Sequence, residues 1–570
     1  MTLLLLTLLA PAGWAFAGEM TAPYVVIFDP GAVSVPDDTI DTSSATAPSF
    51  RFLAAPPTLR AATMAAQPST GAGKTRVDAT RVNTAVRAVA GRNRVRVNSI
   101  YANAVGGFAA HLNSAQLAAI SANPAVGAVI PDLAVSIDDG SVGSEASIMR
   151  NVVRPSWQVP AGVRRVGART SAVQSFTNRT QRGDADVAIL DTGIDRDHPD
   201  LNVVGGYNCT SSNRNKWDDS NGHGTHVAGI VGALDNNIGV VGVAPGVRLW
   251  SVKVLDRKGN GFVSWLVCGI DWVTSQRDRG RATIEVANMS ISFGIGPSPN
   301  STCDNGEDVI HQALCRSVAK GTVYAVAAGN NSHNARRNRP AAYEEVITVS
   351  AMADYDGKGG GRGKASDSCP SRFEPDDSFT RFSNYGSDVD LIAPGRCVLS
   401  TYVGKRYAFM SGTSMATPHV AGAAALYRAM YPNAKPAQVR RALMAVGKLD
   451  WRTASDPDGN PERAVWVGDV RRPPDFTIST ADMGVVNAGG TLNVAVDVSR
   501  IGGFDGPVTF SLDAAPGGFS AQNAMTSGRT AVVHVEVGPR VDAGTYKVTI
   551  VGVGMDVEHR VTIDIVVRRG

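Results

Sequence analysis

Four polar residues, Asp191, His223, Asn330 and Ser414, lie where the sequence predicts that a strand ends or a helix begins. Asp191 and Asn330 follow apolar runs typical of buried strands, whereas His223 and Ser414 precede runs of small residues typical of helices. A carboxylate, an imidazole and a hydroxyl that meet can perform acyl transfer, because the imidazole takes the hydroxyl proton and the carboxylate orients the imidazole. The Asn330 amide and the Ser414 N–H are suited to stabilising the oxyanion.

Each of these residues has an ordinary structural explanation when it is taken alone. Asp191 could cap a turn, Asn330 could be a turn residue, and Ser414 could be a helix N-cap. His223 could be structural or metal-binding, although no acidic residue completes a zinc motif with His226. The presence of all four at element ends, in the chain order Asp, His, Ser, favours a shared site.

The elements that must position these residues alternate between strand and helix over residues 150–450. Apolar runs predict strands at 187–190, 249–255, 285–289, 322–328 and 346–349. Helical patterns lie at 225–234, 264–276, 309–320 and 414–430. This alternation predicts an α/β fold, in which helices cover both faces of a mostly parallel sheet. Sites in such folds form outside the carboxyl ends of the strands.

The segments around the four residues resemble the subtilisin family (subtilases) of serine peptidases. The strings that carry the resemblance are D-T-G-I-D at 191–195, N-G-H-G-T-H-V-A-G at 221–229, A-A-G-N at 327–330 and G-T-S-M-A-T-P-H-V-A-G at 412–422. These strings are long and specific, and the resemblance covers about residues 150–450. It implies a serine endopeptidase with Asp191, His223 and Ser414 as its triad, Asn330 in its oxyanion hole and an acyl-enzyme intermediate.

Two other functions remain open alongside this one. The first is a catalytically silent, subtilisin-like binding protein, against which the intact triad and the intact Asn330 argue. The second is an esterase that uses the same triad, although the strand-pairing cleft of the family favours peptides.

The resemblance also implies where substrate and calcium bind. Family members bind the peptide as an added strand, and the matching residues here are Ser290, Ile291, Ser292, Ala328 and Gly329. The family usually carries Gly where this chain has Ser292, so we expect a narrower rim of the specificity pocket. A structural Ca²⁺ site is implied at Asp200, Leu234, Asn236, Ile238 and Val240, whose carboxylate, amide and backbone oxygens suit a hard cation. Gln158 is a further candidate ligand, but its register is one residue short.

The N-terminal part of the chain predicts export and self-processing. Residues 1–17 have the apolar run and the Ala-x-Ala end of a signal peptide, so we expect a secreted, extracellular protein. Residues 18–148 resemble the inhibitory pro-region of the family, on the string Y-A-N-A-V-G-G-F-A-A at 101–110. Within this pro-region we expect strands at 24–28 and 126–130, a helix at 114–121, an irregular stretch at 42–74 and an exposed, cleavable linker at 136–148.

The C-terminal part differs in its periodicity. We expect the catalytic domain to occupy residues 149–455, followed by a Pro-rich, charged linker at 456–474. Residues 475–570 alternate apolar and polar side chains, which predicts a small antiparallel β-sandwich, resembling immunoglobulin-like modules, as an accessory domain.

Composition limits the partners and suggests disulfides. A net charge of +4 over 570 residues gives no reason to expect nucleic acid or a membrane as partner. We expect a monomer that acts on protein or peptide substrates and is inhibited by its own pro-region. The 6 cysteines allow many pairings, of which the nearest neighbours are Cys303–Cys315 and Cys369–Cys397, leaving Cys209–Cys268. The Gly-rich stretch 354–377 is expected to be a solvated surface loop, with a second cation site as the alternative.

Overall fold

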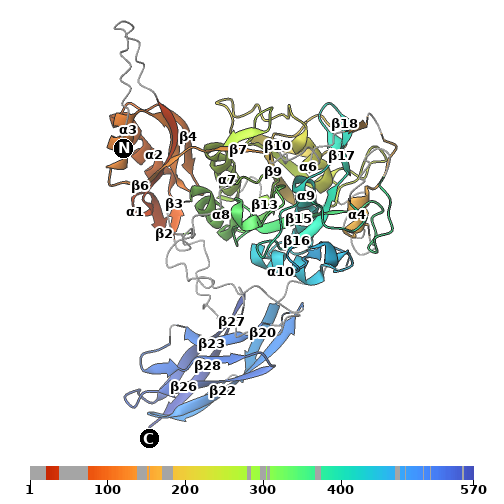
Figure 1. Cartoon of the computed structure of the whole chain (residues 1–570). Helices are drawn as coiled ribbons and strands as arrows, with labels where there is room; N and C mark the ends of the chain where they lie inside the picture. Colours follow the sequence, from red (N-terminus) through yellow and green to blue (C-terminus); the bar gives the residue numbers. More distant parts are fainter. Residues whose placement is uncertain are drawn as a thin grey trace, which may run out of the picture.

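The computed structural model of the chain consists of an N-terminal unit, a central unit and a C-terminal unit (Figure 1). It describes residues 21–36, 75–137, 150–152, 155–169, 184–278, 284–294, 303, 308–365, 374–468, 475–481, 483–502, 504, 506–513, 515–554 and 557–569. The predicted signal peptide at 1–17 and the irregular stretch at 42–74 lie outside the described residues. No helix in the described part of the chain is long and apolar enough to span a bilayer.

The central unit is built on one sheet with the strand order β10-β11-β9-β13-β14-β15-β16-β19. Each neighbouring pair of strands in this sheet is parallel. The strands are β9 (Asp186–Asp191), β10 (Val203–Asn208), β11 (Arg248–Lys253), β13 (Ile284–Met289), β14 (Val323–Ala327), β15 (Ile347–Ala353), β16 (Leu391–Arg396) and β19 (Arg463–Ala464). The predicted α/β fold with a mostly parallel sheet is confirmed.

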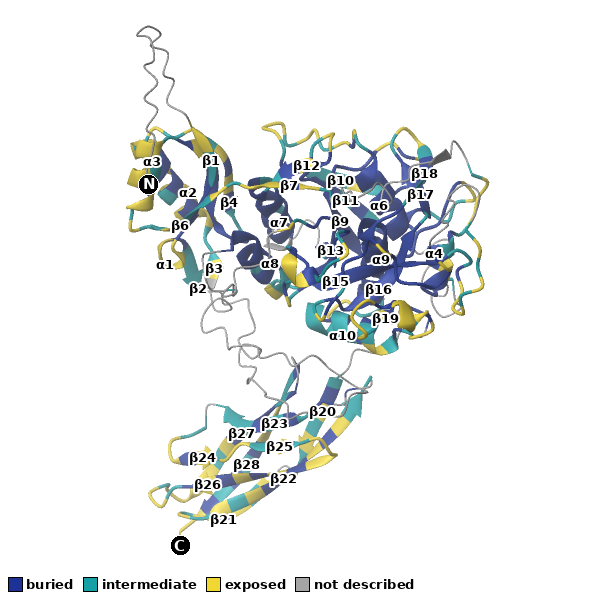
Figure 2. Cartoon of the chain, in the orientation of Figure 1, coloured by how far each residue is buried: buried dark blue, intermediate teal, exposed yellow. Residues whose placement is uncertain are grey.

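Helices cover both faces of this sheet, and most of its strands are buried (Figure 2). Val187 and Ile189 of β9 belong to one apolar core, which includes α6 (His223–Gly232) and α9 (Thr413–Met430). Ala188 and Leu190 belong to a second core, with the other pair of helices. These are α7 (Val263–Asp278) and α8 (Val309–Ala319). Burial on both faces explains why the strands are continuous apolar runs.

The N-terminal unit is an antiparallel sheet with helices on one face. Its strands run in the order β4 (Val97–Ala102), β5 (Gly106–Leu112), β1 (Ala22–Phe28) and β6 (Val126–Pro131). The expected helix is confirmed as α3 (Ser114–Ser121), which begins with a capping box from Asn113. The helix α2 (Ala79–Arg92) was not predicted, although Val82, Val86 and Val89 share its buried face.

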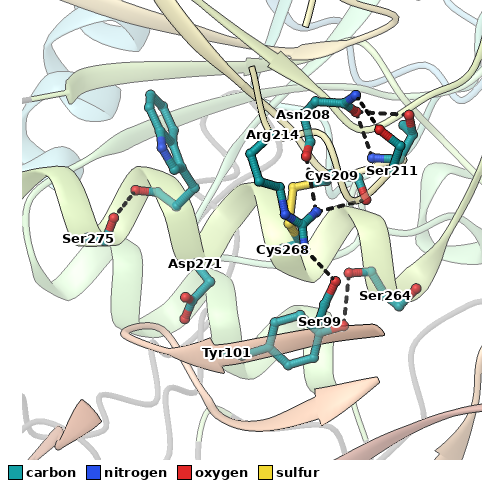
Figure 3. The surroundings of a disulfide bond; sticks show 12 residues. Ser99, Tyr101, Asn208, Cys209, Ser211, Arg214, Ser264, Cys268, Asp271 and Ser275 are labelled. Carbon is teal, nitrogen blue, oxygen red and sulfur yellow. Dashed lines mark hydrogen bonds between the residues drawn. A yellow bond between two sulfur atoms is a disulfide. The ribbon is translucent and has the colours of Figure 1, made fainter. Parts of the chain in front are cut away.

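The other face of the N-terminal sheet packs on the central unit. Val25 and Tyr101 lie in the same apolar core as α7 and α8. The Tyr101 hydroxyl donates to the carbonyl of Ser264 (3.0 Å), and Arg214 donates to the Ser99 hydroxyl (3.1 Å) (Figure 3). The disulfide Cys209–Cys268 lies directly behind these contacts and joins the end of β10 to α7.

Asp271, on α7, anchors the turn between β4 and β5. Its carboxylate accepts hydrogen bonds from the backbone N–H groups of Ala102 (3.2 Å), Asn103 (2.8 Å) and Ala104 (2.7 Å), and from the Asn103 side chain (2.7 Å). In return, Asp132 accepts from the N–H of Ser264 at the start of α7 (2.8 Å). A carboxylate at a helix N-terminus is favoured by the helix dipole, so each unit supplies a charge-assisted anchor to the other.

The end of the N-terminal unit adds a strand to the central unit. β7 (Ala134–Ser136) pairs in antiparallel fashion with β12 (Asn260–Phe262), and the N–H of Ile137 donates to the carbonyl of Gly259 (2.8 Å). Ser136 is exposed, as expected for the start of a linker at 136–148, but the first two residues of this segment are paired with the edge of the central unit and are not a free linker. Residues 138–148 lie outside the described residues.

The predicted linker at 456–474 is wrong in its first part. β19 pairs with β16 as the last strand of the central sheet, and Val465 and Val467 are buried in its core. The charges and prolines of this segment suggested a linker, but its short apolar part completes the central unit, which therefore extends beyond the expected limit of 455. Residues 469–474 lie outside the described residues.

The C-terminal unit consists of two sheets around one apolar core, as expected for a sandwich. The first sheet has the order β20 (Asp475–Thr480), β22 (Thr491–Ile501), β26 (Thr530–Val537), β24 (Phe519–Ala521). The second has the order β21 (Met483–Asn487), β28 (Val557–Arg568), β27 (Gly544–Gly554), β23 (Val508–Asp513), β25 (Ala524–Thr526). The expectation of a purely antiparallel sandwich is wrong in one respect, since β21 pairs with β28 in parallel.

Two of the predicted disulfides are confirmed: Cys209–Cys268 and Cys303–Cys315. Cys397 is disulfide-bonded, but its predicted partner Cys369 lies outside the described residues, so that pairing stays a prediction.

The anchoring by Asp271 can be tested in the Ser414→Ala chain with an engineered protease site within 138–149. After cleavage the parent units should stay together in gel filtration, whereas Asp271→Ala units should separate at about 10- to 100-fold higher protein concentration, because hydrogen bonds to a charged group contribute about 1.5–3 kcal/mol. Asp388→Ala, on the far side of the central unit, is the control. Equal dissociation of the Asp271 and control variants would contradict the anchor.

Candidate active site

The carboxylate of Asp191 and the imidazole of His223 form a buried pair at the carboxyl edge of the central sheet. Asp191 is the last residue of β9 and His223 is the first residue of α6. His223 Nδ1 lies 2.8 Å and 2.9 Å from the two carboxylate oxygens of Asp191, and the exposed fractions are 4% for His223 and 0% for Asp191. A carboxylate at Nδ1 fixes the tautomer in which Nε2 can accept a proton.

A second buried carboxylate, Asp219, organises the turn before His223. It accepts hydrogen bonds from the N–H groups of Asn221 (2.9 Å), Gly222 (3.1 Å) and Thr225 (3.1 Å), and from the Thr225 hydroxyl (2.6 Å). Sequence reasoning missed this residue, since its neighbour Asp218 is exposed and nothing in the sequence distinguishes the two.

The carboxylates of Asp191 and Asp219 together favour the protonated form of His223. Burial alone would lower the pKa of this imidazole, but the attraction and hydrogen bond of Asp191, with a further attraction from Asp219, raise the pKa above its ordinary value. The imidazolium that forms during acyl transfer is therefore stabilised by its surroundings.

Ser414 is the second residue of α9, and its backbone is held by the segment that follows β13. The Ser290 hydroxyl donates to the Ser414 carbonyl (2.8 Å), and the Ser414 hydroxyl donates to the Ser290 carbonyl (3.2 Å). In this structure the Ser414 hydroxyl therefore donates to Ser290 and not to His223. Hydrogen bonds between catalytic groups often tighten only when substrate binds, so this geometry is compatible with attack by Ser414.

The Asn330 side chain and the Ser414 nitrogen lie close to one point beside Gly412. The Oδ1 atom of Asn330 accepts from the N–H (2.8 Å) and the hydroxyl (2.9 Å) of Thr413, which orients the amide and turns Nδ2 the other way. A Cβ atom placed on Gly412 would lie 3.5 Å from Asn330 Nδ2 and 3.6 Å from Ser414 N. Two donors that converge on one point at a helix N-terminus match the requirement for holding an oxyanion.

The five residues predicted to bind substrate lie together beside Ser414. Ser290, Ile291 and Ser292 directly follow β13, and Ala328 and Gly329 follow the adjacent strand β14, with every one of them buried. Gly329 has φ of 106°, and a Cβ there would lie 2.8 Å from the Ser292 hydroxyl, so only glycine fits between the two segments.

The Ser292 hydroxyl is engaged within the protein. It accepts a hydrogen bond from Asn338 Nδ2 (2.8 Å), and the exposed fraction of Ser292 is 3%. The narrower rim of the specificity pocket stays a prediction.

The strand β12 was missed by sequence reasoning, because three residues are too few for a periodic signal.

The residues predicted to hold calcium also come together. Asp200 Oδ2 accepts from the N–H of Val240 (3.0 Å) and the hydroxyl of Tyr407 (3.2 Å), whereas Asp200 Oδ1 is buried and has no hydrogen-bond partner among the described residues. Burial raises the pKa of Asp200 to about 7, as is expected for a carboxylate without a counter-charge. The free oxygen therefore fits a cation at this position.

Backbone hydrogen bonds hold the surrounding loop next to Asp200. Leu234 N–H donates to the carbonyl of Asp200 (2.9 Å), which holds the start of the loop 234–240 against it. Gln158 pairs with Val240 and donates its N–H to the carbonyl of Gly239 (3.0 Å), so the doubtful ligand does reach this loop.

Comparison with known proteins identifies the family of the central unit. Residues 183–459 match the family described as "Subtilase family", and residues 23–138 match the family described as "Peptidase inhibitor I9". Subtilisin from Bacillus pumilus is 38% identical over 288 residues, which are 50% of this chain and 90% of that protein. The chain belongs to the subtilase family.

Other relatives align over a similar share of this subtilase. Subtilisin NAT from Bacillus subtilis subsp. natto is 38% identical over 288 residues, which are 50% of this chain and 65% of that protein. Subtilisin Savinase from Lederbergia lenta is 38% identical over 285 residues, covering 50% of this chain and 90% of that protein. A crystal structure of a cold adapted subtilisin-like serine proteinase matches with 30% identity over 54% of this chain and 97% of that chain, at a TM-score of 0.42.

The stretch 354–377 of this subtilase is mostly exposed at 358–364, as expected for a solvated loop, but its two ends are buried. Asp354 and Asp377 are buried and form ion pairs with the buried Arg165, at 3.0 Å and 3.3 Å, and Arg165 also pairs with Asp450 at 2.6 Å. The expectation is wrong for these ends, because Asp354 and Asp377 pair with an arginine that is distant in the sequence. Residues 366–373 lie outside the described residues.

The influence of Asp219 on His223 can be measured directly. Asp219→Asn removes a negative charge close to the imidazole, so the pKa of His223 should fall, by up to about one unit. NMR titration of the His223 ring protons in the Ser414→Ala chain measures it. The exposed neighbour provides the control, and Asp218→Asn should change the pKa much less. A His223 pKa that responds equally to both variants would contradict a specific role for Asp219.

Proposed function

We propose that this subtilase is a secreted serine endopeptidase that is made as a self-processing zymogen. The observation that carries the proposal is the buried Asp191–His223 pair at the start of α6, which packs against α9, where Ser414 lies with the Asn330 amide nearby. The family assignment makes peptide-bond hydrolysis the reaction that this geometry fits best.

In the proposed reaction, His223 Nε2 accepts the proton of the Ser414 hydroxyl as its oxygen attacks the peptide carbonyl. Asp191 stabilises the imidazolium, and Asn330 Nδ2 with the Ser414 N–H stabilises the oxyanion. The imidazolium then gives its proton to the leaving amine, so an acyl-enzyme remains on Ser414. Water repeats the sequence with His223 as base and releases the carboxylate product.

The proposed substrates are proteins and peptides, bound as an added strand. The pairing of β7 with β12 supports this choice, because part of the chain itself already lies as an added strand on β12, at an edge of the central unit. Backbone pairing recognises an extended peptide with little dependence on its side chains. The N-terminal unit would thus inhibit the enzyme, by lying along the edge that a substrate would use, until it is cut off.

Ser414→Ala tests the reaction. The variant should fold as the parent does but lose casein hydrolysis, self-processing and labelling by a fluorophosphonate, because the nucleophilic oxygen is gone. Ser411→Ala, three residues earlier, should keep all three. Labelling or parental casein hydrolysis by Ser414→Ala would refute the assignment. A parent chain that takes up no label would favour a silent binding protein, and ester cleavage without peptide cleavage would favour an esterase.

We further propose that Asp200 and Asn236, with the backbone carbonyls of Leu234, Ile238 and Val240, bind a structural Ca²⁺. The unpartnered buried oxygen of Asp200 supports this site. When bound, the ion supplies a positive charge that neutralises the Asp200 carboxylate. It would also hold the loop 234–240 next to Asp200, which precedes β10.

Removal of calcium should lower the stability of the protein. EDTA is expected to reduce the thermal midpoint of the Ser414→Ala chain, since a ligand that binds only the folded state stabilises it. Restoring Ca²⁺ in excess over EDTA should reverse the change, whereas Asp200→Asn should reduce the response. A midpoint that is indifferent to EDTA would rule out the site.

A further inference from the structure

A second group of oxygen-bearing side chains lies at the opposite edge of the central sheet from the Asp200 loop. Asp200 precedes β10, the first strand of the sheet, whereas residues 456–462 precede β19, the last strand. In the segment 456–462, acidic or amide side chains occupy four alternate positions: Asp456, Asp458, Asn460 and Glu462. The two groups therefore cannot share one ion.

The carboxylates at the two ends of this segment are buried. The exposed fractions are 9% for Asp456 and 8% for Glu462. Asp456 Oδ1 accepts from the N–H groups of Asp458 and Gly459 (3.0 Å each), but Asp456 Oδ2 and Glu462 Oε2 have no hydrogen-bond partner among the described residues. Each carboxylate therefore buries one oxygen that no well-formed hydrogen bond from the described residues reaches.

The two carboxylates also repel each other. After burial itself, the charge of Asp456 is the next cause that raises the pKa of Glu462 well above its ordinary value. The nearest arginine in the sequence, Arg463, is exposed and donates to the carbonyl of Gly447 (2.9 Å), and so does not neutralise the pair. Buried charges of the same sign are costly unless a proton or a cation neutralises them.

A comparison within the molecule shows what neutralisation looks like. Asp354, Asp356 and Asp376 form a tighter acidic group, but there the side chain of Arg165 pairs with Asp354. Among the described residues, no arginine or lysine is a main influence on the charge of Asp456 or Glu462. The hydroxyl of Ser350 on β15 is also buried and lies beside Glu462, where it favours the charged form of that carboxyl.

We propose that Asp456 and Glu462, with the neighbouring oxygens of Asp458, Asn460 and Ser350, bind a divalent calcium ion. Carboxylate, amide and hydroxyl oxygens are the donors that this hard cation prefers. The ion would fix the segment that leads into β19 and so the point at which the central unit continues toward the C-terminal unit. Trp451 lies against the same segment and donates its indole N–H to the carbonyl of Glu462 (2.9 Å).

The first test counts bound calcium in the Ser414→Ala chain, after dialysis against a low concentration of free Ca²⁺. Glu462→Gln should lower the bound Ca²⁺ by one ion per chain, Asp200→Asn should independently lower it by one, and the double variant by two. Glu344→Gln, an exposed acid elsewhere in the central unit, should leave the count unchanged. A count that Glu462→Gln does not alter overturns the proposal, whatever Asp200→Asn does.

The second test separates a cation from a shared proton. Glutamine resembles protonated glutamate, so Glu462→Gln should raise the thermal midpoint in EDTA, by removing the repulsion, but reduce the gain on adding Ca²⁺. If the pair instead shares a proton, the gain on adding Ca²⁺ will equal that of Glu344→Gln, and the proposal fails. Asp458→Asn, an exposed change that spares the fold, should raise the Kd of this ion by about tenfold or more, and an unchanged Kd counts against the site.

Discussion

The direction of the strands in the central sheet is the constraint on which the candidate active site depends. Because neighbouring strands are parallel, their carboxyl ends meet at one edge, where Asp191 ends β9 and Asn330 follows β14. The crossover helices must then begin at the same edge, which brings the N-termini of α6 and α9, with His223 and Ser414, to it. The unpaired N–H groups of helix starts favour negative charge, both on Asp219 and on an oxyanion beside Gly412.

The buried carboxylates among the described residues differ in whether hydrogen-bond donors reach both of their oxygens. Asp219 is buried and accepts a set of backbone and hydroxyl donors from the turn that it organises, and Asp271 does the same across the interface with the N-terminal unit. Asp200 and Glu462 differ, since each buries an oxygen with no donor among the described residues. The same physical rule thus explains why the first two act as structural anchors and why the last two suit ions.

Sequence predicted most of the central unit because its strands are short apolar runs and its site residues stand in long, specific strings. Asp219 could not be found in this way, since an aspartate that is buried and one that is exposed look alike in a turn. The segment that ends in β19 was mistaken for a linker, because prolines, glycine and acids are typical both of linkers and of ion-binding loops. Only the pairing of β19 with β16 and the burial of Val467 separate the two cases.

The N-terminal unit packs on the central unit through a shared apolar core, and is not a loosely tethered inhibitor. Val25 and Tyr101 lie in one apolar cluster with α7 and α8, so loss of the unit would return part of that cluster to water. The polar contacts at its rim go mostly to backbone groups of the turn between β4 and β5, and they therefore depend on the shape of that turn more than on its side chains. A segment that completes a core can promote folding of the helices it covers, and the same strand addition that aligns β7 on β12 keeps that edge covered while the unit stays bound.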